Sequence, residues 1–113
     1  MTGGESVQWR KRVVVYSSPI HGQGVFAARR IRAGAYIGTF EGDRTTRDGL
    51  HVLWILGDDG RYLGIRGRNE LRYLNHSSGA NAELRGADLY ALRHIQPGRE
   101  ITLDYGPDWE GVE

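Results

Sequence analysis

Apolar residues in this chain occur in short runs rich in β-branched and aromatic side chains, a pattern that favours strands throughout. The run at residues 13–16 (VVVY) is ended by residues 17–19 (SSP), where serine and proline favour a turn. Similar runs predict further strands at residues 24–28, 36–41, 82–84, 89–92 and 100–103. We therefore expect a mostly β protein.

The middle of the chain predicts a β-hairpin. Two apolar runs, residues 51–56 (HVLWIL) and 62–65 (YLGI), flank residues 57–60 (GDDG), a sequence typical of a tight turn. Residues 68–74 (RNELRYL) are the least strand-like part and predict one or two helical turns. Residues 1–8 are expected to form a flexible tail, so that residues 9–113 form a single domain.

Two segments of the chain resemble each other. Residues 27–37 (AARRIRAGAYI) and 91–101 (ALRHIQPGREI) both fit the pattern A-x-R-x-I-x-x-G-x-x-I. Each copy would form a strand, a short turn at glycine and another strand, so we expect two corner hairpins that bracket a small, approximately symmetric sheet assembly. Two independent β-turns built from common residues are the alternative.

Composition narrows the class of protein. Glycine supplies 17 of 113 residues, which disfavours long helices, because each interior glycine costs a helix about 1 kcal/mol. The absence of cysteine excludes a disulfide scaffold, a cysteine-ligated zinc site and a cysteine nucleophile. A net charge of +1 and 39% hydrophobic residues indicate neither a disordered tail nor a strongly basic DNA-coating protein. Neither a signal-like segment nor an apolar run of about 20 residues is present, which favours an intracellular protein.

Conventional catalytic motifs are scarce. The four histidines show no spacing typical of metal ligands, so no metal site is expected. No serine lies in a G-x-S-x-G motif, and the G-x-G sequence at residues 22–24 precedes no helix, which argues against a dinucleotide-binding fold. On its own, that G-x-G is most simply a tight turn.

Three polar segments call for another explanation. Residues 72–78 (RYLNHSS) place loop-forming polar residues directly after an apolar helical turn, Asn81 follows them, and residues 100–106 (EITLDYG) end a strand with an acid and a tyrosine. Taken singly, Asn75 and His76 also fit a buried hydrogen-bonded pair, and Tyr105 fits a core aromatic residue. The residues alone leave these alternatives open.

Together and in this order, the segments resemble the SET-domain protein lysine methyltransferases. The resemblance runs from Val13 to Tyr105 and rests on residues 17–37 (SSPIHGQGVFAARRIRAGAYI), 40–42 (FEG), 68–78 (RNELRYLNHSS) with Asn81, and 98–106 (GREITLDYG). It implies a SET domain, a β-clip-like arrangement of small sheets in which the C-terminal segment passes under the N-H-S loop as a pseudoknot. It also implies methyl transfer from S-adenosylmethionine to a lysine of a protein or peptide.

The resemblance assigns roles to individual residues. Tyr105 would be catalytic, orienting the amine and the methyl group through its hydroxyl, and would line a substrate channel with Phe40 and Leu103. Asn81 and Glu100 would hold the knot by hydrogen bonds. The implied cofactor-binding residues are His21, Gly22, Gln23, Gly24, Arg72, Tyr73, Asn75, His76 and Trp109. For Trp109, a partly exposed tail residue is the alternative.

Three departures from the family pattern bear on activity. Phe40 stands where many members have a second active-site tyrosine, which removes one hydroxyl near the lysine nitrogen. Ser78 replaces a cysteine common after N-H-S, and no cysteine-rich tail follows Tyr105, so the family's zinc-bound lid is not expected. The insert at residues 44–66 is minimal, as in short viral and bacterial members, some of which dimerise. The HVLWIL strand would then be a homodimer interface or pack inside its own chain.

Histone or histone-like basic tails are the substrates expected from the resemblance, and ribosomal and other proteins, which members of the family also methylate, are the alternatives. Direct contact with nucleic acid or membrane is not expected. The protein would act in the cytoplasm, or in a host nucleus if a bacterium exports it or a virus makes it. A non-catalytic SET-like module that binds a peptide or partner is the main alternative. A β-clip domain of the SAF type is another.

Overall fold

The computed structural model describes residues 9–49 and 51–104, so the tail expected at residues 1–8 lies outside the described part. That part contains ten strands and two 3-10 helices. In chain order they are η1 (Trp9–Lys11), β1 (Val13–Ser17), β2 (Gln23–Ala27), β3 (Tyr36–Thr39), β4 (Gly42–Thr45), β5 (Val52–Leu56), β6 (Tyr62–Gly67), η2 (Glu70–Tyr73), β7 (Asn75–His76), β8 (Ala82–Arg85), β9 (Asp88–Ala91) and β10 (Glu100–Leu103).

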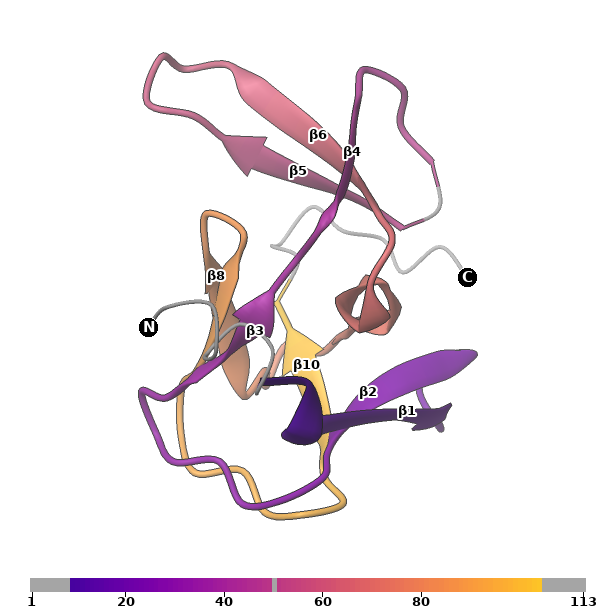
Figure 1. The fold of residues 1–113 in the computed structure, drawn as a ribbon, viewed down its shortest axis with the longest axis vertical. Helices are drawn as coiled ribbons and strands as arrows, with labels where there is room; N and C mark the ends of the chain where they lie inside the picture. The colour runs from indigo at the N-terminus through magenta and orange to yellow at the C-terminus, as the bar shows by residue number, and fades with distance from the viewer. Residues whose placement is uncertain (1–8, 50, 105–113) are drawn as a thin grey trace.

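Three small sheets build the fold (Figure 1). Their strand orders are β1-β2-β10-β7, β3-β9-β8 and β4-β6-β5. The β4-β6-β5 sheet lies at one end of the molecule, and the loops 28–35 and 92–99 lie at the other end. The predicted mostly β fold of small sheets is confirmed. Among the described residues, no helix is long and apolar enough to cross a membrane.

Trp9 anchors the start of the described chain in the core. Its side chain is 1% exposed, and its ring lies against Gly38 of β3, where a Cβ would come within 2.6 Å of the ring. Each large side chain buried in this way contributes about 1.5–3 kcal/mol to folding. The most completely buried side chains are Trp9, Val25, Ile37, Leu71, Leu89 and Ile101.

The two similar segments form matched corners. Ile31 and Ile95 pair with each other as an antiparallel bridge, through N–H to carbonyl bonds of 2.9 and 2.8 Å. The Gly34 N–H donates to the Ala91 carbonyl at 2.8 Å, and the equivalent Gly98 N–H donates to the carbonyl of Ala27 at 2.7 Å. Equivalent residues therefore make equivalent bonds, and the predicted approximate symmetry is confirmed.

The sequence predicts that the corners are hairpins, and this prediction is wrong. The strands before and after each corner do not pair with each other: β2 pairs with β10, and β9 pairs with β3. Each copy of the repeat thus gives one strand to each of two sheets. The local sequence pattern predicts the turn, but the strand with which each strand pairs lies in the other copy of the repeat.

The other element predictions are mostly confirmed. The hairpin forms from β5 and β6, and the helical turn forms as η2. The single strand expected at residues 36–41 is wrong, because β3 ends at Thr39 and β4 begins at Gly42 in a different sheet. Gly42 lies so close to the Arg66 carbonyl that a Cβ would overlap it, and this contact lets the chain cross between sheets.

Alanine at either corner glycine should destabilise the fold by about 1 kcal/mol. Gly34 and Gly98 have φ of +82° and +86°, and nothing lies within 4 Å of either Cβ position, so the cost comes from the backbone. Gly49 also has open space but no left-handed φ, so Gly49→Ala is the matched control and should be near neutral. Urea denaturation measures all three variants, and equal stabilities would contradict the prediction.

Candidate active site

The G-x-G sequence begins at the end of the loop that joins β1 to β2 and continues into β2, so that we call residues 21–24 the G-x-G loop. Gly22 has φ +46°, a left-handed conformation that other residues rarely adopt, and its carbonyl accepts the Ser18 N–H at 2.7 Å. The Ser18 hydroxyl oxygen accepts the Ile20 N–H at 2.9 Å. His21, Gly22 and Gln23 are exposed, whereas Gly24 is buried. Hydrogen bonds therefore hold this exposed turn in a defined conformation.

Asn75 connects this loop to the N-H-S segment. It lies in β7, and its Nδ2 donates to the carbonyl oxygens of His21 at 3.1 Å and Gln23 at 3.0 Å. The same nitrogen donates to Glu100 Oε2 at 2.8 Å. One side-chain amide therefore links the G-x-G loop, β7 and β10.

The Glu100 carboxylate is the centre of this cluster. Ser18 Oγ lies 2.8 Å from both of its oxygens. On the neighbouring strand, a Cβ at position 24 would overlap Oε2. Glycine at position 24 thus makes room for the carboxylate. The role expected for Glu100, holding the fold by hydrogen bonds, is confirmed, whereas contact of Gly24 with a cofactor stays a prediction. The role of Ser18 was not predicted from the sequence, because a serine before a proline turn is too common to stand out.

Strand β10 passes between β2 and the N-H-S segment. It runs parallel to β7, with Thr102 opposite Asn75 and Leu103 opposite His76. The Asn81 side chain bonds to the backbone of β10 as a neighbouring strand would. Its Nδ2 donates to the Glu100 carbonyl at 2.8 Å, and its Oδ1 accepts the Thr102 N–H at 2.9 Å. The structural role expected for Asn81 is therefore confirmed.

His76 faces the end of β10. Its Nδ1 lies 4.0 Å from Asp104 Oδ1, so protonation of the imidazole would create an ion pair there. The His76 side chain is 17% exposed and that of Asp104 is 54% exposed. The predicted catalytic Tyr105 follows directly, but Tyr105 and Trp109 lie outside the described residues.

Arg72 and Tyr73 lie in η2 and contact each other through their side chains. Arg72 Nη1 donates to the carbonyl oxygens of Arg68 at 2.8 Å and Asn69 at 3.0 Å. Its Nη2 donates to Tyr73 Oη at 2.7 Å, with the guanidinium 4.3 Å from the centre of that ring. His51 Nδ1 lies 2.9 Å from the Arg72 carbonyl, which ties the start of the β5–β6 hairpin to this unit. Contact between Arg72 or Tyr73 and a cofactor stays a prediction.

Phe40 and Leu103, the described residues expected in the substrate channel, both belong to the main core cluster. Phe40 is 7% exposed and Leu103 is 6% exposed. The tip of the Phe40 ring lies against Gly67, where a Cβ would come within 2.7 Å of Cζ. Both side chains therefore provide an apolar wall, and their contact with a substrate stays a prediction.

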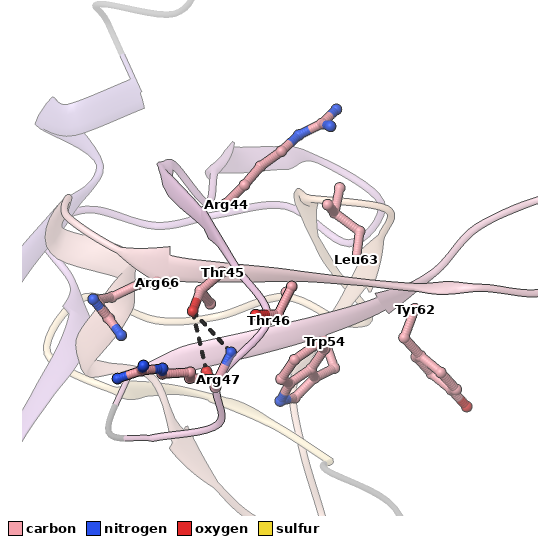
Figure 2. A pocket seen from close by; sticks show the side chains of 9 residues that line it. Arg44, Thr45, Thr46, Arg47, Trp54, Tyr62, Leu63 and Arg66 are labelled. Atoms are coloured by element: carbon pink, nitrogen blue, oxygen red, sulfur yellow. Dashed lines mark hydrogen bonds between the residues drawn. The ribbon is translucent and has the colours of Figure 1, made fainter.

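A pocket outside this site lies on the β4-β6-β5 sheet (Figure 2). It has a volume of about 830 Å³ and is lined by Arg44, Thr45, Thr46, Arg47, Trp54, Tyr62, Leu63, Gly64 and Arg66. A second, of about 540 Å³, lies over β1 and β2. Neither contains a predicted site residue. No group of three or more His, Cys, Asp or Glu in the described ranges could hold a metal ion.

Replacing Asn75 by aspartate should destabilise the protein by roughly 2–3 kcal/mol at pH 7. The change removes the donor to two carbonyls and places a carboxylate beside Glu100. Gln96→Glu, the same chemical change at an exposed position, is the control and should alter stability by no more than about 0.5 kcal/mol. Urea denaturation compares the two, and equal losses would show that the Asn75 amide does not link the segments.

Asp48, beside the larger pocket, should titrate differently when Trp54 is replaced by phenylalanine. The Trp54 indole N–H donates to Asp48 Oδ1 at 3.1 Å, and this bond, with a smaller effect from the Gly49 N–H, holds the pKa of the Asp48 carboxyl below its usual 3.8. Trp54→Phe removes the larger cause, so the pKa should rise. Carboxyl NMR titration measures it, and an unchanged pKa would contradict the bond.

Comparison with known sequences places these features in a family. The SET-domain sequence profile matches residues 22–106. The histone-lysine N-methyltransferase MEDEA of Arabidopsis thaliana is 30% identical over 128 residues, which cover 91% of this chain and 19% of that protein. The H3 lysine-36 specific histone-lysine N-methyltransferase of Yarrowia lipolytica is 27% identical over 123 residues, covering 89% and 16%. The chain thus spans less than a fifth of the length of these curated relatives.

Solved structures share the fold. The methyltransferase domain of human PR domain-containing protein 2 superposes with a TM-score of 0.67 at 21% identity, over 90% of this chain and 82% of that one. A Plasmodium falciparum protein solved as a candidate histone methyltransferase gives a TM-score of 0.66 at 19% identity, over 87% and 96%. With the profile match over more than half of its length, the chain belongs to the SET-domain family.

Proposed function

We propose that this SET domain transfers methyl groups from S-adenosylmethionine to lysine side chains of histones or histone-like basic tails. The observation that carries the proposal is the Asn75 amide, which joins the exposed G-x-G loop to the N-H-S strand beside β10. The strand β10 leads directly to Tyr105, the residue that matches the family's tyrosine. Relatives named as histone-lysine methyltransferases support the same activity.

The described residues fit a cofactor that carries a nucleoside and an amino-acid end. His21, Gly22 and Gln23 are exposed, and nothing lies within 4 Å of the Cβ position of Gly22, so a ligand has room there. The loop, Asn75 and His76 would hold the cofactor, with Arg72 and Tyr73 beside them. When bound, S-adenosylmethionine supplies an electrophilic methyl group.

The protein's own contribution would be positioning and the exclusion of water. A lysine must be neutral to accept a methyl group, and burial beside Phe40 and Leu103 would lower its pKa, because an apolar surrounding disfavours the ammonium. The Tyr105 hydroxyl would orient the nitrogen. Since Phe40 offers no hydroxyl, this orientation would depend on Tyr105 more than in members with two tyrosines.

A homodimer is the quaternary state that we propose. Strand β5 forms one edge of the β4-β6-β5 sheet, which leaves backbone groups free to pair with another strand. Two of its own side chains, Trp54 and Leu56, are 37% and 59% exposed, and Tyr62 of β6 is 66% exposed. A second copy would cover this apolar surface.

The competing function is a non-catalytic SET-like module that binds a peptide without methylating it. The buried Phe40 favours this alternative, because it replaces an active-site hydroxyl. Calorimetric titration with S-adenosylhomocysteine, followed by a transfer assay, separates the two. Absence of cofactor binding would contradict the proposed function, and binding without transfer to any histone would favour the non-catalytic module.

Tyr105→Phe should reduce methyl transfer to a histone mixture by about 100-fold, because removal of one orienting hydroxyl costs a rate of that order. Binding of S-adenosylhomocysteine should be retained. Tyr16→Phe removes a hydroxyl from an exposed position in β1, outside the proposed dimer surface, and should leave the rate unchanged. Mass spectrometry of the histones measures the transfer, and a Tyr105→Phe variant with full activity would rule out this role for the tyrosine.

A further inference from the structure

The two paired corner loops concentrate positive charge at one end of the molecule. Residues 28–35 (ARRIRAGA) and 92–99 (LRHIQPGR) contain five arginines and one histidine but no aspartate or glutamate. All six of these side chains belong to exposed residues, namely Arg29, Arg30, Arg32, Arg93, His94 and Arg99. We call this surface the arginine corner; its loops lie at the end of the molecule away from the β4-β6-β5 sheet (Figure 1).

The charge of the arginine corner is not neutralised locally. The ion pairs of the described ranges involve other residues, at Arg10, Arg68, His76 and Arg85. Within the corner, the Arg93 guanidinium donates a hydrogen bond to the Ala80 carbonyl at 3.1 Å. The remainder of the sequence carries ten Lys and Arg against fourteen Asp and Glu. A small net charge therefore conceals a strongly uneven distribution.

The approximate symmetry of the corners places basic side chains at two equivalent positions. Arg29 occupies the place in the first copy that Arg93 occupies in the second, and Arg30 corresponds to His94. Ile31, between Arg30 and Arg32, is 2% exposed, with its side chain in the core. Since neighbouring side chains of extended backbone point to opposite sides, the residues that flank this isoleucine face solvent, as their exposure shows.

We propose that the arginine corner binds the phosphate backbone of double-stranded DNA without reading its sequence. Guanidinium groups match phosphate oxygens through paired N–H donors, and free guanidiniums displace the counterions condensed on DNA. The two backbones of a duplex are related by two-fold axes, so the basic residues of the two approximately symmetric loops can contact phosphates on both strands. Neither loop contains a phenylalanine, tyrosine or tryptophan, the large rings on which unpaired bases stack best, which favours a duplex over a single strand.

This proposal revises the expectation of no direct nucleic-acid contact, which followed from a net charge of +1. Net charge describes the whole chain, whereas binding to phosphates depends on the local field of a surface. The proposal does not rest on methyl transfer, because DNA binding can be measured without cofactor or lysine substrate.

The test compares two variants of equal charge. One replaces Arg29, Arg30, Arg32 and Arg99 by glutamine, and the control replaces Arg44, Arg47, Arg61 and Arg66, which are also exposed but lie on or beside the β4-β6-β5 sheet. Each variant loses four positive charges. Fluorescence anisotropy with a labelled 20-base-pair duplex of arbitrary sequence measures binding between about 50 and 200 mM salt, and circular dichroism confirms that both variants are folded.

For about four phosphate contacts, we expect affinity of the unmodified protein to fall about 100-fold across this salt range. The corner variant should lose at least about tenfold in affinity at the lower salt concentration and most of the salt dependence, and the control should lose much less. Equal losses in both variants, or unchanged binding in the corner variant, would overturn the proposal. Poly-glutamate that competes with DNA at equal charge concentration would assign the corner to acidic proteins instead, and would also overturn it.

Discussion

The burial of strand β10 between β2 and the N-H-S segment is the constraint on which the rest of the structure depends. Ile101, Thr102 and Leu103 are almost fully buried, so the backbone groups of this strand need partners inside the protein. Strand β2 supplies them along one edge. The two residues of β7 are too few for the other edge, and the Asn81 amide takes the place of the missing backbone. A side chain is thereby part of a sheet.

The candidate site is built from the same hydrogen bonds that hold β10. Asn75 links the segments and is one of the residues that we propose to hold the cofactor, and Glu100 keeps the G-x-G loop in place through Ser18. Loss of activity on substituting these residues would therefore combine loss of structure with loss of binding. The Tyr105→Phe substitution changes none of these residues, which makes it the better probe of chemistry.

Local sequence patterns were sufficient for most of the fold and for part of the site. The turn at residues 57–60 and the repeated isoleucine–glycine spacing act over a few residues, so the hairpin and both corners could be predicted. Strand β7 could not, since two residues show no periodicity and their partner lies in β10. The pairing of strands between the two corners also depends on residues far apart in the sequence. The hydrogen bond from the Arg72 guanidinium to the Arg68 carbonyl depends on side-chain geometry that the sequence pattern does not contain.

The strand order β1-β2-β10-β7 has a consequence for synthesis of the chain. A ribosome delivers β1 and β2 first, and they can form their hairpin early, but β2 then keeps one edge open until β10 has emerged. The same delay applies to β3, which waits for β9. During this interval the nascent protein exposes two unpaired strand edges, so its need for protection against aggregation should be greatest just before the final strand of the described fold leaves the exit tunnel.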